Sequence, residues 1–343
     1  MTFGDVPLAA AEGSILAHSV RVASGRLRKG RVLDASDIAS LRAAGHETVI
    51  AATLGPDDVA ENAAAAALAA ALVPDPAAAG VSLTAPFTGR VNVLAGGPGV
   101  TLLDVAAIHA ANAVHPMITI ATVPPHQQMA RQGMMATVKI ISYAVPRAAL
   151  EAACAAARDA LRLAVPVRRS ATLIVTEIDG GPGAKGQDAI AGRLTALGAT
   201  LDDVISVPHR TNPLAGAIAE VRSDVALILT GSATSDPEDV APAALRAAGG
   251  TVTRFGMPVD PGNLLFLGDL SGRPVIGLPG CARSPALNGA DWVLSRVTCD
   301  VPVTDADIAG MGVGGLLKEI PTRPQPRRGR TGNPAAQEAL SSD

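Results

Sequence analysis

The sequence is poor in aromatic residues and in charge, and each shortage excludes a class of partner. Aromatic residues make up 2% of the 343 residues, so the chain lacks the stacking platforms on which single-stranded nucleic acids bind. Charged residues make up 17% and the net charge is −3, which gives no electrostatic attraction to nucleic acid or to an anionic membrane. We therefore expect neither a nucleic-acid partner nor a membrane partner.

Cysteine is also scarce, and the N-terminus has no basic segment before its apolar residues. The three cysteines, Cys154, Cys281 and Cys299, contain no CxxC pair, which argues against a disulfide framework or a zinc site. The alanine-rich segment at residues 59–73 is too short to span a bilayer. Together with the absence of a signal-peptide pattern, these features predict a cytoplasmic protein.

The length and the pattern of the chain indicate two main parts. Residues 1–165 have a mixed α+β pattern, which can be divided into two small subdomains at 1–85 and 86–165. The segment LAVPVRRS, residues 163–170, is typical of a linker. Residues 166–322 form the second predicted domain, and residues 323–343 lack apolar periodicity, which is typical of a disordered tail.

From Ala171 onward, predicted strands alternate with predicted helices. ATLIVTEI, DVISV and DVALILT are β-branched or apolar runs, and the segments between them have helical periodicity. Strands that alternate with helices of this length favour a parallel sheet. The sequence therefore predicts an α/β domain with a doubly wound, mostly parallel sheet and helices on both of its faces.

Two of the predicted strand ends share one pattern, in which a turn of small residues leads to a polar residue and a proline. TGSATSDPED follows Leu229, and PGCARSP follows Leu278. Asp236-Pro237 and Ser284-Pro285 are each typical of an N-cap with proline at the first helical position. Because ligands bind beyond the carboxyl ends of parallel strands, both helix N-termini would face one crevice that suits a phosphate.

The acidic residues of the first turn have two interpretations. Asp236, Glu238 and Asp239 are residues that any helix favours at its start, and the spacing of the two aspartates resembles a capping box. Alternatively, a carboxylate beside an anion site would hold Mg²⁺ together with substrate phosphate. His209 follows another predicted strand, where it is either a ligand-site residue or a solvated loop residue.

These segments, in this order, resemble the molybdopterin-binding fold of molybdenum-cofactor biosynthesis proteins, especially molybdopterin molybdenumtransferase. GSATSDPEDV stands where that family has a Gly-Gly turn and a helix-opening aspartate, which Asp239 matches. VDPGNLLFLG is similar to its Pro-Gly segment, and GLPGCARSP to its Gly-Leu-Pro-Gly-Asn-Pro turn. The likeness covers about residues 171–301, and ATVKIISYAV in the first half is similar to a reduced variant of the enzyme.

The resemblance implies binding of molybdopterin or its adenylylated form, with Mg²⁺-dependent transfer of molybdate to the pterin and release of AMP. Asp239 would hold Mg²⁺ or orient water, together with either Glu177 or Asp179. The residues that would contact the pterin are Thr176, Thr230, Gly231, Ser232, Ser235, Asp236, Gly262, Pro279, Gly280, Arg283 and Ser284. A homodimer through the N-terminal half is a further expectation from the family.

The motifs also depart from the family pattern. Ser232 replaces the second glycine, Asp260 and Asn263 stand where the family has basic residues, and Cys281-Ala282 replaces Asn-Pro. These departures favour a second function, that of a non-catalytic carrier or chaperone. Such a carrier would hand molybdopterin to a molybdoenzyme or to another cofactor-biosynthesis protein. A sugar- or nucleotide-binding α/β protein would use the same crevice and is a third interpretation.

Overall fold

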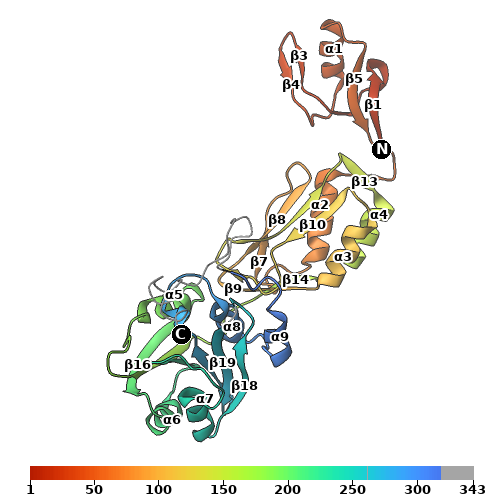
Figure 1. Ribbon diagram of the computed structural model, residues 1–343. Helices are drawn as coiled ribbons and strands as arrows, with labels where there is room; N and C mark the ends of the chain where they lie inside the picture. Colours follow the sequence, from red (N-terminus) through yellow and green to blue (C-terminus); the bar gives the residue numbers. More distant parts are fainter. Residues whose placement is uncertain (261, 318–343) are drawn as a thin grey trace, which may run out of the picture. The chain divides into compact units, whose positions relative to one another are not determined.

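The structure is a computed structural model that describes residues 1–260 and 262–317 (Figure 1). It divides into two compact units, one from Met1 to Val167 and one from Arg168 onward. The segment predicted as a disordered tail, residues 323–343, lies outside the described residues. None of the helices in the described part has the length and apolar character needed to cross a membrane.

The second unit alternates strands and helices as far as β18 and continues as a strand meander. Its elements are β15 (Ser170–Glu177), α5 (Gln187–Ala196), β16 (Thr200–Pro208), α6 (Thr211–Glu220), β17 (Val225–Leu229), α7 (Val240–Ala247), β18 (Thr251–Met257), β19 (Asn263–Leu270), β20 (Arg273–Leu278), the 3₁₀ helix η2 (Gly280–Arg283), α8 (Gly289–Thr298) and α9 (Asp305–Gly310). The helical crossovers after β15 and β16 let their strands run parallel, whereas β18, β19 and β20 are antiparallel neighbours with no helix between them.

The six strands form one sheet in the order β16-β15-β17-β20-β19-β18. β16, β15, β17 and β20 are parallel to one another, and β19 is the strand that runs in the opposite direction. β17 and β20 are adjacent, with Leu229 in register with Leu278. The prediction of an α/β domain with a mostly parallel sheet is therefore confirmed.

Helices cover both faces of this sheet (Figure 1). Alternate residues of one strand face opposite ways, so Leu173 packs with α5 and α8 on one face, while Ile174 packs with α6 and α7 on the other. Both strand residues are fully buried. A central strand that is covered on both sides is mostly apolar, which explains the continuous run VALIL of β17.

The first unit has two hydrophobic cores of its own. Its elements are β1 (Thr2–Pro7), the 3₁₀ helix η1 (Leu8–Ala10), β2 (Ile15–Leu16), β3 (Val20–Val22), β4 (Gly25–Leu27), α1 (Ala35–Ala43), β5 (Thr48–Thr53), β6 (Asp58–Ala60), α2 (Glu61–Leu72), β7 (Val81–Leu83), β8 (Arg90–Ala95), β9 (Gly99–Leu103), α3 (Val105–Val114), β10 (Ile118–Thr122), β11 (Gln128–Met129), β12 (Met134–Ile140), β13 (Ala144–Pro146), α4 (Arg147–Ala156) and β14 (Leu161–Ala164). One core spans residues 8–51 and the other residues 64–163. The two cores separate earlier in the chain than the expected division at residue 85, because α2 packs in the second core.

Candidate functional site

A cavity of about 360 Å³ lies at the carboxyl ends of β17 and β20. The parallel register of these strands brings the turns that follow Leu229 and Leu278 to the same edge of the sheet. The lining residues are Pro182, Leu229, Thr230, Gly231, Ser232, Ala233, Thr234, Asp260, Gly262, Asn263, Leu264, Leu278, Pro279, Gly280, Cys281 and Arg283. The volume is within the range of small-molecule sites.

Thr176 joins three strand ends behind the cavity wall. Its hydroxyl accepts a hydrogen bond from the Gly231 N–H at 2.9 Å and lies 2.7 Å from His209 Nδ1. The Thr176 side chain is fully buried, so it positions the turn after β17. Gly231 has to be glycine, because a Cβ there would lie 2.7 Å from the Thr176 carbonyl oxygen.

Arg283 connects the two sides of the cavity through backbone carbonyl groups. Its guanidinium donates to the carbonyl oxygens of Thr230, Gly183 and Lys185, at 2.8, 3.1 and 2.5 Å. Partial burial lowers the pKa of the Arg283 guanidinium. The loop before α5 packs against this residue so closely that a Cβ on Gly186, at φ +98°, would clash with Arg283 Cα. Arg283 therefore lines the cavity and also stabilises its wall.

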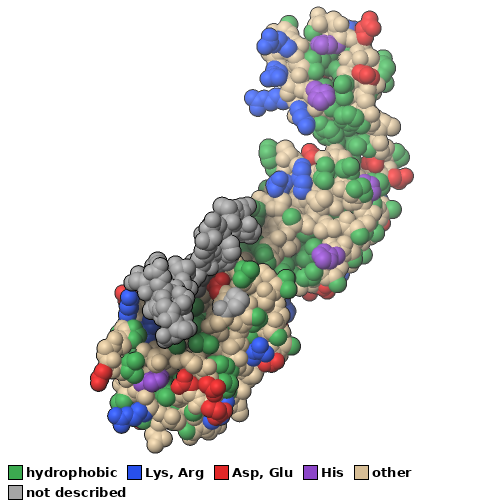
Figure 2. Space-filling view, viewed as in Figure 1, with side chains coloured by type: hydrophobic (Ala, Val, Ile, Leu, Met, Phe, Trp, Pro, Cys, Tyr) green, Lys and Arg blue, Asp and Glu red, His purple; other side chains and the backbone are tan. Residues whose placement is uncertain are grey.

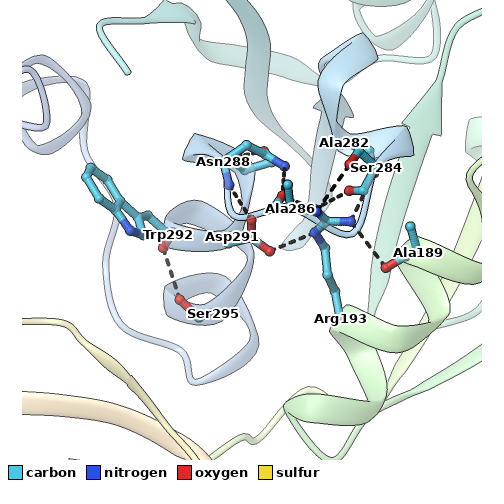
Figure 3. A network of polar contacts seen from close by, with 10 residues as sticks. Ala189, Arg193, Ala282, Ser284, Ala286, Asn288, Asp291, Trp292 and Ser295 are labelled. Carbon is cyan, nitrogen blue, oxygen red and sulfur yellow. Dashed lines mark hydrogen bonds and ion pairs between the residues drawn. The ribbon is translucent and has the colours of Figure 1, made fainter. Parts of the chain in front are cut away.

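A buried arginine on α5 holds the segment that follows β20 (Figure 3). Arg193 Nε donates to Asp291 Oδ1 at 2.7 Å, and its terminal nitrogens donate to the carbonyl oxygens of Ala189, Ala282, Ser284 and Ala286. Asp291 also closes a capping box with Asn288 at the start of α8. All five N–H groups of the guanidinium are thus satisfied inside the protein, and η2 and the residues after it are fixed relative to α5.

The polar groups of the cavity include a buried amide. Asn263 is 5% exposed, and its Oδ1 accepts from the Leu265 N–H. Its Nδ2 has no hydrogen-bond partner within the described residues. A buried amide donor without a partner costs free energy, and this donor lies beside the start of α8, where a Cβ on Gly289 would come within 3.0 Å of it. Asp260 and the free thiol of Cys281 line the same cavity.

The helix starts that the sequence predicted near the cavity are wrong. α7 begins at Val240 with Asp239 as its N-cap, not at Pro237 with Asp236. Asp239 Oδ1 accepts from the Val240 N–H at 2.7 Å, and Oδ2 accepts from the Ser235 N–H at 2.9 Å. The proline pattern is misleading because Pro237 belongs to a turn in which Asp236 accepts from the Glu238 N–H.

The second predicted helix start differs in the same way. Ser284 ends η2 and does not cap α8, which begins at Gly289 with Asn288 as its N-cap. Ser284-Pro285 lies in the exposed connection between these two elements. Neither Asp236 nor Ser284 is therefore the N-cap of its helix, and neither residue lines the cavity.

The structure brings about half of the predicted site residues into the cavity wall. Those that line it are Thr230, Gly231, Ser232, Gly262, Pro279, Gly280 and Arg283. Those outside its lining are Thr176, Glu177, Asp179, Ser235, Asp236, Asp239 and Ser284.

Sequence reasoning missed Pro182, Thr234 and Leu264 as lining residues, and only the tertiary fold reveals their place. Asp260, Asn263 and Cys281 stood out in the sequence as departures from the family pattern.

The acids to which the resemblance assigned Mg²⁺ do not meet at the cavity. Both carboxylate oxygens of Asp239 already accept backbone N–H groups. Glu177 and Asp179 are exposed and border a separate hollow with Ser206 and Pro208. Nowhere in residues 1–260 and 262–317 do three or more His, Cys, Asp or Glu side chains come close enough to hold a metal ion.

Asp239→Ala should lower the free energy of unfolding by about 0.5–2 kcal/mol, because it removes an N-cap. The matched change Asp236→Ala removes an exposed carboxylate that accepts one loop N–H, and should cost less than about 0.5 kcal/mol. Urea titrations of the two variants beside the wild type would measure the difference. Equal costs would contradict the assignment of Asp239 as the cap.

The chain has one match to a known family model and a weak likeness to a solved structure. A family model described as a domain of unknown function (DUF8806) matches residues 5–53. No curated protein matches the chain. Among solved structures, the chain is similar to a molybdopterin biosynthesis MoeA protein from Pyrococcus horikosii, with 13% sequence identity and a TM-score of 0.30 over 88% of this chain and 75% of that one. A TM-score of this size does not define a fold or a function for the chain.

Proposed function

We propose that the second unit binds molybdopterin, or its adenylylated form, in the strand-end cavity and takes part in molybdenum cofactor biosynthesis. One observation carries this proposal. The three segments that resemble the molybdopterin-binding family are separate in the sequence, yet residues 230–234, residues 262–264, and residues 279–281 with Arg283 line one cavity. Three segments that resemble one family support a common binding site when all three line the same cavity.

The chemistry of the cavity suits a polar heterocycle. Three of the lining residues, Gly231, Gly262 and Gly280, have no side chain, so a ligand in the cavity can contact their backbone groups. Asn263 and Asp260 place an amide and a carboxylate among the lining residues. A pterin ring carries both donors and acceptors on its edge, so a mixed set of this kind can fix its orientation.

A non-catalytic carrier is favoured over a Mg²⁺-dependent transferase by the position of the acids. Asp239 is occupied as a cap, and Asp260 is the one carboxylate among the described lining residues. Incubation of the protein with adenylylated molybdopterin, molybdate and Mg²⁺ would separate the two functions. Stoichiometric binding without AMP supports the carrier, and turnover with AMP release supports the transferase.

Gly280→Leu should weaken molybdopterin binding by at least about tenfold, equivalent to about 1.4 kcal/mol, and leave the melting temperature unchanged. A Cβ on Gly280 would meet no atom within 4 Å, and Gly280 lines the cavity, so we expect the larger side chain to take up ligand space at little cost to the fold. Fluorescence titration with molybdopterin and a thermal melt would measure both effects.

Gly216→Leu is the matched control for this experiment. Gly216 is exposed on α6, and a Cβ there also meets no atom within 4 Å. We expect this variant to bind molybdopterin like the wild type. Unchanged binding in Gly280→Leu would place the pterin elsewhere. Binding of a sugar or a nucleotide, with no affinity for molybdopterin, would overturn the proposed ligand class.

A further inference from the structure

The hairpin of β3 and β4 in the first unit has one apolar face and one cationic face. A two-residue turn joins the strands, and Val22 and Leu27 are buried in the core of residues 8–51. Arg21, Arg26 and Arg28 alternate with these residues and are exposed. Lys and Arg side chains gather over β3 and β4 in Figure 2. We call the three exposed arginines the arginine face.

The positive charge of the arginine face is not neutralised by ion pairs with other residues of the described chain. Arg21 and Arg26 lie directly opposite each other in the hairpin register, an arrangement of like charges that destabilises a strand pair. None of the three has an ion pair or a side-chain hydrogen bond within residues 1–260 and 262–317. Arg31, by contrast, pairs with Asp37 at 2.5 Å. A hairpin that keeps Arg21 opposite Arg26 without an acidic partner in the described chain indicates that an anionic group of another molecule binds there.

The local charge is strong although the chain as a whole is acidic. Residues 13–33 contain five Lys or Arg and no Asp or Glu, whereas the net charge of the whole chain is −3. Arginine pairs with carboxylate and phosphate groups through two parallel hydrogen bonds, which lysine cannot do. The face therefore suits a partner that presents several such groups at the spacing of a short hairpin.

A carboxylate-rich protein fits this face better than a nucleic acid does. Exposed acidic residues border the cationic segment in the chain at Glu12 and Asp34, so a long polyanion that extends past the hairpin would meet negative charge. Three arginines are also fewer than the six to ten phosphate contacts that are typical of nucleic-acid binding. No aromatic residue lies within residues 13–33 to stack on a base.

We propose that the arginine face docks an acidic, Asp- and Glu-rich segment of a partner protein. The face lies within residues 5–53, which match the uncharacterised family, and in a different unit from the strand-end cavity. The proposal therefore does not depend on the ligand of that cavity. It assigns an interaction surface to the N-terminal part of the chain.

A fluorescein-labelled oligo-glutamate peptide is the probe for this surface, with anisotropy measured over a series of salt concentrations. The full-length wild type should bind it, and added salt should weaken the binding. Arg21→Glu should reduce the affinity at least about tenfold, as expected for the loss of a charge-assisted contact. The same variant should raise the melting temperature, because a carboxylate opposite Arg26 replaces a like-charge pair with an attractive one.

Arg158→Glu is the matched control, since Arg158 is exposed in the same unit and lies outside the arginine face. It should bind the peptide nearly as well as the wild type. Equal loss in both variants, or a lower melting temperature for Arg21→Glu, would overturn the proposal. So would tighter binding of a single-stranded oligonucleotide or of phosphatidylserine vesicles through Arg21. Self-association that disappears in Arg21→Glu would make a second copy the occupant and would also overturn it.

Discussion

Arg193→Met is expected to lower the free energy of unfolding by about 3–5 kcal/mol, because it removes one partner of a buried ion pair. Arg193 is 9% exposed, and its Nε lies 2.7 Å from Asp291 Oδ1. Methionine keeps much of the apolar stem but leaves the carboxylate of Asp291 and the carbonyl oxygens of Ala282, Ser284 and Ala286 without their donor (Figure 3). Chemical denaturation followed by circular dichroism would measure the cost.

The control for this prediction is an arginine that makes similar contacts at the surface. Arg246 lies 3.2 Å from Glu238 and also donates to the Pro237 carbonyl oxygen, but both side chains are exposed. Arg246→Met should cost at most about 1 kcal/mol. If the two variants unfold with the same free energy, the buried network adds no more to stability than the surface contacts of Arg246 do. Adding Asp291→Asn to Arg193→Met should recover part of the loss, because it removes the uncompensated charge.

The alternation of strands and helices in the second unit could be predicted because its central strands contain runs of apolar residues. VALIL in β17 is fully enclosed, and such runs are distinct from the amphipathic helices between them. The meeting of two strand ends at one edge followed from the same pattern, since parallel strands end on one side. The local composition was sufficient to predict these strands, because buried strand positions are filled mainly by apolar residues.

The helix starts could not be predicted from the same kind of signal. Asp236-Pro237 and Ser284-Pro285 satisfy the local preferences of an N-cap, but those preferences are shared by turns. The contacts of Asp239 with the N–H groups of Ser235 and Val240 decide the cap in α7. Because a capping carboxylate and a metal-binding carboxylate are the same residue type, the partners of its oxygens have to be known before the role of Asp239 can be assigned.

The role of Arg193 was also hidden in the sequence. An arginine between Ile190 and Leu194 on an amphipathic helix is typical of a solvated side chain, and its acceptors lie about 90 residues away in the chain. Carbonyl acceptors leave no mark on the sequence, because every residue has one. Positions whose side chains bind backbone groups are therefore the ones that sequence patterns reveal least.

Thr176→Val is expected to lower the free energy of unfolding by about 1–3 kcal/mol, because it leaves a buried N–H without an acceptor. Valine has nearly the same shape as threonine, so the change removes the hydroxyl and little else. The Gly231 N–H loses its partner at 2.9 Å, and His209 Nδ1 loses the hydroxyl at 2.7 Å. Since the turn after β17 forms part of the cavity wall, molybdopterin affinity should also fall by at least about tenfold.

Thr172→Val separates this positioning role from a general effect on the sheet. Thr172 lies on the same strand and is 3% exposed, and its hydroxyl is hydrogen-bonded to Ser223 at 2.9 Å, near the opposite end of β15 from the cavity. Its loss should lower stability less, because Ser223 is only partly buried, and it should leave molybdopterin affinity unchanged. Titrations well below both melting temperatures would compare the two variants. If Thr172→Val weakens binding as much as Thr176→Val, the hydroxyl of Thr176 stabilises the sheet as a whole and does not position the cavity wall.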